Sequence, residues 1–137
     1  MAVIHSYLRF DGNAQEAFDF YKSVLGGDLT ITKVGDSEMA QFMPEKKDKI
    51  FHAQLKKGEL VLLGSDLGPD EGLTKGNTMV LTLECSSKEE AHTLFDKLAE
   101  GGKVGHPLGE MGFGTIGDLQ DKFGVDWFIV AMKNPQE

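Results

Sequence analysis

The sequence predicts an α+β fold built from two copies of one β-α-β-β-β module. Three observations support this prediction: an amphipathic strand leads into an amphipathic helix twice, a Gly-Gly pair follows each helix, and the two pairs lie about 75 residues apart. The pairs are Gly26-Gly27 and Gly101-Gly102. The chain of 137 residues is long enough for one domain. We therefore expect a single domain over residues 1–137, with module one at 1–66, a linker at 67–76 and module two at 77–137.

The first strand is predicted over residues 3–10, where apolar and polar side chains alternate. The following helix is predicted over 14–25, with Asn13 as its N-cap and Glu16 completing a capping box. Gly26-Gly27 should end it. Its apolar stripe consists of Ala14, Ala17, Phe18, Tyr21, Val24 and Leu25.

The rest of module one contains further strand-like segments. They are predicted at residues 28–34, 38–42, 50–56 and 59–64. Lys57-Gly58 fits a hairpin turn between the last two segments. The charged segment 44–49 is expected to be a solvated loop.

Module two repeats the pattern. A strand is predicted over 78–85, and Ser86 with Glu89 forms a second predicted capping box. The stripe of the second helix consists of Ala91, Leu94, Phe95, Leu98 and Ala99. Three weaker strands are predicted around 104–108, 113–119 and 125–132.

Charge and cysteine content limit the partners and the compartment. The formal net charge of −8 argues against nucleic acid or anionic lipid, because both require clustered Lys and Arg. No apolar run approaches the roughly 20 residues of a membrane span, and the first ten residues do not fit a signal peptide. The one cysteine, Cys85, cannot close an intrachain disulfide. We therefore expect a protein of the reducing cytoplasm that binds neither nucleic acid nor membrane.

One helix per module leaves one face of each sheet without a helix. Because successive side chains of a strand point to opposite faces, the residues on that uncovered face can be read from the sequence. Its polar members are His5, Tyr7, Arg9, Thr30, Thr32, His52, Gln54, Thr78 and Thr82. A curved sheet lined in this way would form a concave small-molecule site. A face that is simply wetted by solvent would show the same alternation.

Four segments resemble a known family. They are residues 5–13 (HSYLRFDGN), 20–27 (FYKSVLGG), 52–55 (HAQL) and 121–127 (DKFGVDW). Together they resemble the PhnB-like branch of the vicinal oxygen chelate superfamily, which also contains glyoxalase I, extradiol dioxygenases, fosfomycin-resistance proteins and bleomycin-binding proteins. The resemblance implies a U-shaped mixed sheet around a cup, and a homodimer.

The resemblance also indicates where metal-dependent members would hold a divalent ion. His5 matches the ligand of the first strand, whereas the other ligand positions fall at Leu63, Thr78 and Phe128. Leu and Phe cannot donate to a metal, and a stable site requires three or four donors. We therefore expect neither a glyoxalase-type metal site nor another cofactor. His5 with His52 is a poorer alternative, in which a carboxylate of Glu59, Asp66 or Asp118 would assist.

The expected function is the binding of a small organic molecule in the cup. Phe128 would form an apolar wall, and Arg9 would pair with a carboxylate or phosphonate. The polar contacts would be His5, Tyr7, Arg9, His52, Gln54 and Thr78.

Three more specific hypotheses stay open. One is a metal-dependent lyase, isomerase or oxygenase of the glyoxalase or dioxygenase kind. Another is a metal-free protein that sequesters a drug-like compound, which the missing metal ligands favour over the first. The third is a domain without a ligand that acts only through its dimer surface. Members of the branch are often labelled ubiquinone methyltransferases, but no glycine-rich loop suited to S-adenosylmethionine follows the first strand.

Two further segments bear on the site. His106, which precedes Pro107, and the glycine-rich run 109–117 are expected near the cup rim, in a loop and a following strand. Cys85 is expected to be a packed small residue, because no partner base is evident in the sequence.

Overall fold

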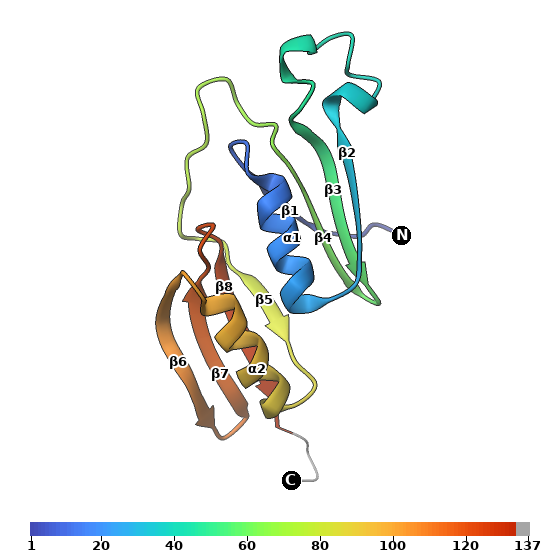
Figure 1. The fold of residues 1–137 in the computed structure, drawn as a ribbon. Helices are drawn as coiled ribbons and strands as arrows, with labels where there is room; N and C mark the ends of the chain where they lie inside the picture. Colours follow the sequence, from blue (N-terminus) through green and yellow to red (C-terminus); the bar gives the residue numbers. More distant parts are fainter. Residues whose placement is uncertain (134–137) are drawn as a thin grey trace. The chain divides into compact units, whose positions relative to one another are not determined.

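A strand, a helix and three further strands build each half of the chain (Figure 1). The computed structural model describes residues 1–133, and the chain divides into unit 1, Met1–Lys75, and unit 2, which begins at Gly76. The predicted α+β class with two β-α-β-β-β modules is confirmed. No helix among the described residues is long and apolar enough to cross a membrane.

Unit 1 places α1 against one mixed sheet, here called sheet A. Its strand order is β1-β4-β3-β2, with β1 parallel to β4 and the other neighbours antiparallel. Two short 3-10 turns, η1 (Val34–Asp36) and η2 (Pro44–Lys46), lie between β2 and β3. The main elements are β1 (Ser6–Arg9), α1 (Ala14–Leu25), β2 (Asp28–Lys33), β3 (Ile50–Lys57) and β4 (Leu60–Ser65).

Unit 2 repeats this topology in sheet B. The strand order is β5-β8-β7-β6, and again only the first strand, β5, pairs in parallel, with β8. The elements are β5 (Leu81–Glu84), α2 (Lys88–Ala99), β6 (Lys103–Met111), β7 (Gly114–Gln120) and β8 (Asp126–Met132).

Each helix lies against its own sheet (Figure 1). Most of the predicted stripe residues are buried there, and Leu94 and Ala99 of α2 are half-buried. All six predicted stripe residues of α1 are buried. Phe18 lies at the centre, with its ring edge-to-face on Phe10 and Tyr21 at centroid distances of 6.1 and 5.9 Å. Gly64 of β4 leaves room for this ring, because a Cβ there would lie 2.7 Å from a Phe18 ring carbon. In α2, Ala91, Phe95 and Leu98 are buried.

Glycine ends α1 as predicted. Gly26 has φ of +76°, a conformation that glycine adopts without a Cβ clash, and its N–H donates to the Lys22 carbonyl at 2.8 Å. After α2 the corresponding residue is Gly101, with φ of +75°. The predicted function of the two Gly-Gly pairs as helix stops is therefore confirmed.

The predicted caps need correction. The Asn13 side chain makes no capping hydrogen bond at the start of α1. Asp66, which directly follows β4, takes its place: Oδ1 accepts from the Gly12 and Ala14 N–H groups at 3.1 and 2.9 Å, and Oδ2 accepts from the Ile50 N–H at 2.9 Å. The carboxylate thus ties the start of α1 to the ends of β3 and β4.

The cap of α2 lies one residue later than predicted. Ser87, not Ser86, is the N-cap, and its Oγ accepts from the Glu90 N–H at 3.1 Å. Glu90 returns the contact, since its Oε1 accepts from the Ser86 N–H at 2.9 Å. The box therefore uses Glu90 in place of the predicted Glu89.

The first strand of each unit begins three residues later than predicted. β1 pairs with β4 from Ser6 onward, although β4 begins two positions earlier in the register, at Leu60. Ile4 is 96% exposed and does not face α1. In unit 2, β5 begins at Leu81 rather than at residue 78. Met79, inside the predicted strand 78–85, lies before β5 and is 83% exposed.

Two further predictions about local structure were wrong. Residues 38–42 form turns rather than a strand, because their backbone bonds are local, as in Ala40 N–H to the Ser37 carbonyl and Phe42 N–H to the Met39 carbonyl. The loop expected in the run 109–117 is also absent, because residues 109–111 belong to β6. The strand that was expected to follow is present as β7. His106 lies in β6, which agrees with the strand predicted around 104–108 and not with the loop expected for this residue.

Replacing Asp66 tests whether its carboxylate stabilises the start of α1 and the start of β3. Asp66→Ala leaves three backbone N–H groups without their acceptor, so we expect the free energy of unfolding to fall by about 2 kcal/mol or more. Urea denaturation followed by circular dichroism measures this change. Asn13→Ala is the matched control and should change stability by less than about 0.5 kcal/mol, because no capping bond is lost. Equal losses in both variants would contradict the assignment.

Candidate functional site

Two rows of side chains lie on the face of sheet A that is turned away from α1. Strand register defines them, because residues paired across a sheet share a face. The first row runs Tyr7, Leu63, Gln54 and Thr30 across β1, β4, β3 and β2. The second row pairs Arg9 with Ser65 and Thr32 with His52.

The intervening rows face α1 and form the core. Leu55 pairs with Leu62, and both are buried. Ala53 pairs with Gly64 and is also buried. The structure therefore places Tyr7 and Gln54 in one row and Arg9 and His52 in the adjacent row, on the face opposite to this core.

His5 lies apart from His52. It precedes β1 and is exposed. Arg9 lies in the same row as His52, two strands away, and His5 precedes Arg9 by four residues. If β1 continued straight, the backbone positions of His5 and His52 would therefore be separated by about 13 Å along the strands and about 10 Å across them. Metal–nitrogen bonds are only about 2.0–2.1 Å long, so two imidazoles so far apart cannot share an ion. The alternative site of His5 with His52 is therefore not formed.

The three carboxylates considered as metal ligands beside His5 and His52 either bond other groups or lie in an exposed turn. Both oxygens of Asp66 accept backbone N–H groups. Glu59 is exposed in the turn before β4, and Asp118 of unit 2 bonds His106. Among the described residues no group of three or more His, Cys, Asp or Glu side chains is arranged to hold a metal ion.

The ligand positions implied by the resemblance do not fit a divalent ion. Leu63 stands in the middle of the first row of sheet A and has no donor atom. Thr78 lies in an exposed bend before β5, outside the predicted strand. Phe128 lies in β8, opposite Thr82 and Asp118, and is half-buried. Of the four positions only His5 carries a strong donor.

Sheet B carries a polar pair that the strand patterns missed. Thr82, Phe128, Asp118 and His106 form one row across β5, β8, β7 and β6, on the face turned away from α2. His106 Nδ1 lies 2.7 Å from Asp118 Oδ2. The signal available in the sequence was Asp118, a charged residue inside the predicted strand around 113–119.

The segment 121–127, part of the family resemblance, has a structural role. Asp121 is buried, and its Oδ1 accepts from the Phe123 and Val125 N–H groups at 2.9 and 3.0 Å. Its Oδ2 accepts from Trp127 Nε1 at 2.8 Å. Trp127 itself is buried in the core of unit 2. This part of the pattern therefore specifies the turn between β7 and β8 rather than a ligand contact.

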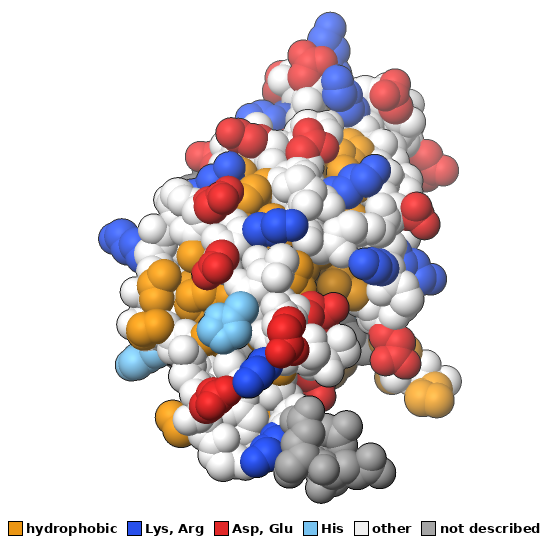
Figure 2. All heavy atoms as spheres, turned by 60° about the horizontal axis from the view of Figure 1, so that its bottom comes forward, with side chains coloured by type: hydrophobic (Ala, Val, Ile, Leu, Met, Phe, Trp, Pro, Cys, Tyr) orange, Lys and Arg blue, Asp and Glu red, His pale blue; other side chains and the backbone are white. Residues whose placement is uncertain are grey.

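Charged side chains of both signs are mixed on the surface. On the face drawn in Figure 2, Lys and Arg side chains alternate with Asp and Glu side chains and do not gather into a basic patch. This distribution agrees with the net charge of −8 and offers no surface there for a polyanion.

Cys85 is a packed thiol. It is 6% exposed, and its desolvation by burial, together with the nearby Glu90 carboxylate, raises its pKa from 9.0 to about 11. A thiol is nucleophilic only as the thiolate, so Cys85 is protonated and inert at neutral pH.

A family model and several relatives match this chain over nearly its whole length. The model described as 3-demethylubiquinone-9 3-methyltransferase matches residues 2–130. The crystal structure of PA1353 from Pseudomonas aeruginosa is 39% identical with a TM-score of 0.84, and the match covers 98% of this chain and 100% of that one. A PhnB protein from Bacillus cereus is 29% identical with a TM-score of 0.74, covering 95% and 99%. The protein YjdN of Escherichia coli K12 is 29% identical, covering 93% of both chains.

More distant structures share the fold alone. The fosfomycin resistance protein FosX of Listeria monocytogenes is 11% identical with a TM-score of 0.65, and the match covers 97% of this chain and 94% of that one. The predicted fold class, that of the glyoxalase and bleomycin-resistance proteins, is therefore confirmed in its two four-stranded mixed sheets with one helix each.

Thiol labelling tests the state of Cys85. Because its pKa is about 11 in the folded protein, we expect iodoacetamide at pH 8 to label the native protein about 100-fold more slowly than the protein unfolded in urea, as measured by mass spectrometry. The folded state holds this proton more tightly than the unfolded state does, so the contribution of Cys85 to stability should be complete below pH 9 and fall as the pH rises toward 11. Equal labelling rates in both states would contradict this description.

Proposed function

We propose that unit 1 of this chain binds a small organic molecule. The chain belongs to the PhnB-like family described as 3-demethylubiquinone-9 3-methyltransferase, and the proposal proceeds from that membership. The binding surface is the face of sheet A that is turned away from α1. The observation that supports it is the register of β1, β4, β3 and β2, which collects an aromatic hydroxyl, an amide, an imidazole and a guanidinium in two adjacent rows.

Each side chain of this face would contact the ligand in a different way. Arg9 pairs with an anionic head group, because a guanidinium binds a carboxylate or phosphonate through two hydrogen bonds. Tyr7 and Gln54 donate and accept hydrogen bonds in the adjacent row, and His52 does so beside Thr32. Leu63, between Tyr7 and Gln54, offers an apolar contact. Such a mixture of apolar area with few polar groups is typical of small-molecule sites.

Neither metal chemistry nor methyl transfer forms part of this proposal. The ligand positions implied by the superfamily hold Leu63 and Phe128, which cannot bind an ion. A methyltransferase of the Rossmann type requires a doubly wound parallel sheet with a glycine-rich first turn. Sheet A instead has a mixed order, and residues 11–13 after β1 read Asp-Gly-Asn.

The proposal keeps several expectations from the sequence. Thr78 and Phe128 stay predicted ligand contacts of unit 2, and His5 stays a predicted contact of unit 1. A homodimer and a cytoplasmic location likewise stay predictions. The buried, protonated Cys85 is compatible with a reducing compartment.

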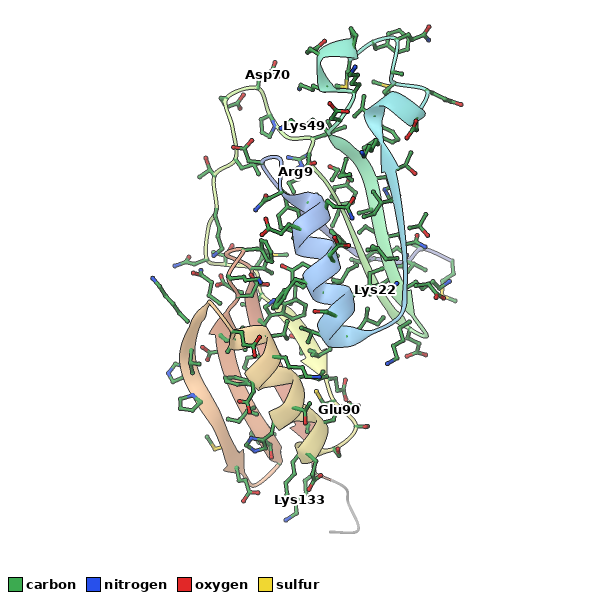
Figure 3. All side chains as sticks on the ribbon, viewed as in Figure 1. Arg9, Lys22, Lys49, Asp70, Glu90 and Lys133 are labelled. Carbon is green, nitrogen blue, oxygen red and sulfur yellow. The ribbon has the colours of Figure 1, made fainter. Side chains whose placement is uncertain are left out.

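Removing the guanidinium tests the binding face. We expect phenylphosphonate or benzoate to raise the melting temperature of the wild-type protein and to lose at least half of that shift in Arg9→Gln, because a ligand stabilises by mass action only the state it binds. Differential scanning fluorimetry measures the shift. Lys22→Gln is the matched control, since it also removes one exposed cation, from the last turn of α1 (Figure 3). Equal shifts in all three proteins, or none in the wild type, would overturn the proposed function.

Metal analysis tests the second part of the proposal. We expect protein purified without chelator to contain substoichiometric zinc, nickel and manganese, because one strong donor does not make a stable site. Inductively coupled plasma mass spectrometry gives the ratio, and His5→Ala should leave it unchanged. A stoichiometric metal that disappears in His5→Ala would favour the alternative of a metal-dependent lyase, isomerase or oxygenase.

A further inference from the structure

Strand β6 is irregular on both sides of His106. The register pairs Val104 with Leu119, His106 with Asp118 and Gly109 with Ile116. One extra residue of β6 therefore stands between Val104 and His106, and another between His106 and Gly109. Bulges of this kind redirect individual side chains and are frequent beside active sites.

The bulged segment presents a histidine held by a carboxylate. His106 Nδ1 lies 2.7 Å from Asp118 Oδ2. The side chain of His106 is 85% exposed and that of Asp118 is 42% exposed. When Nδ1 carries the proton and donates to the carboxylate, Nε2 has a free lone pair directed away from Asp118.

Glycine residues make room for this pair. A Cβ on Gly105 would overlap Asp118 Oδ1, so the carboxylate can lie beside β6 only because residue 105 has no side chain. A Cβ on Gly117 would lie 2.9 Å from the His106 carbonyl oxygen and 3.0 Å from the Leu108 nitrogen. A Cβ on Gly109 of the same strand would meet nothing within 4 Å. Of these two glycines of β6, only Gly105 is needed to make room for the Asp118 carboxylate.

An open hollow of about 490 Å³ in unit 2 is lined by Asp118 and by Val104 and Gly105, the two residues before His106, while His106 itself is not part of the lining. Its size falls within the range of small-molecule sites. Phe128, the register neighbour of Asp118, offers an aromatic surface, and Lys103 and Asp126 add charges of opposite sign. Its side chains include Val80, Lys103, Asp118, Gln120, Asp126 and Phe128.

We propose that His106 is a general base, positioned by Asp118, for a small organic molecule that carries an acidic C–H or O–H and approaches the exposed imidazole from solvent. The arrangement is that of a base oriented by a third group, in which the carboxylate fixes the tautomer and stabilises the imidazolium that forms. It concerns the sheet of unit 2, so it stands or fails separately from the binding face proposed for unit 1.

The step requires no co-reactant. Nε2 of His106 takes the proton, and its N–H bond forms as the substrate's C–H or O–H bond breaks. The substrate keeps the electron pair as an enolate, a phenolate or a new bond. The imidazolium then releases the proton to solvent, to which His106 is exposed.

A chromogenic probe of base catalysis tests the proposal. In 5-nitrobenzisoxazole, loss of the ring C–H proton to a base forms a nitrile and breaks the N–O bond, which gives a coloured cyanonitrophenolate. We expect the wild-type protein to accelerate this reaction above buffer, and His106→Gln to lower the acceleration about 10-fold or more. His92→Gln is the matched control, because His92 is an exposed histidine of α2, and it should keep the wild-type rate.

Two glycine variants test whether catalysis needs His106 held by Asp118 or only an exposed imidazole. Gly105→Ala keeps both His106 and Asp118 but displaces the carboxylate, so we expect it to lose most of the acceleration. Gly109→Ala should retain it. Thermal unfolding checks that both variants are folded, and a Gly105→Ala protein that unfolds would leave His106→Gln and His92→Gln as the deciding comparison.

Nitrogen NMR of the imidazole gives an independent readout of positioning. We expect the Nδ1–H tautomer of His106 in the wild type, a shift toward the Nε2–H tautomer in Asp118→Ala, and partial recovery in Asp118→Asn, whose amide oxygen can still accept. The proposal is overturned if His106→Gln keeps the wild-type rate, if His92→Gln loses as much, or if Asp118→Ala leaves the tautomer unchanged.

Discussion

The parallel pairing of β1 with β4 is the constraint on which the arrangement of unit 1 depends. It places Tyr7 beside Leu63 and Arg9 beside Ser65, and the antiparallel pairs extend these rows to β3 and β2. A slip by one residue would turn Tyr7 and Arg9 toward α1. Asp66 stabilises this register, because its carboxylate joins the start of α1 to the backbone at the start of β3. The same residue therefore supports both the helix and the polar face.

The sequence predicts those features of the fold that depend on the local spacing of residues. The six stripe residues of α1 and the glycine stop of the helix follow from spacing alone, and the structure agrees. It does not predict where the first strand of each module begins: β1 and β5 begin at Ser6 and Leu81, three residues later than the alternation indicates. Nor does it predict the cap of α1, since the acceptor is 52 residues away in the chain.

The same distinction applies to the candidate sites. Alternation assigns Tyr7, Arg9, His52 and Gln54 to one face, but only the register shows which of them share a row. His106 could not be placed by alternation, because the bulges of β6 interrupt the period of two on which that argument rests. Its partner is identified by pairing with β7, which a single strand does not encode.

The two units share a topology and differ in the chemistry of their uncovered faces. Sheet A presents regular rows of polar side chains, whereas sheet B presents one polar row interrupted by an irregular edge strand. Several carboxylates that could have served as metal donors have structural roles: Asp66 and Asp121 each accept three hydrogen bonds from backbone or indole N–H groups. If such a carboxylate turned to a metal ion, each partly buried or buried donor would lose its acceptor, at a cost of about 1–3 kcal/mol each. In this chain the fold itself therefore opposes the use of these two carboxylates as metal ligands, and the proposed small-molecule binding depends on the imidazole, phenol, amide and guanidinium groups.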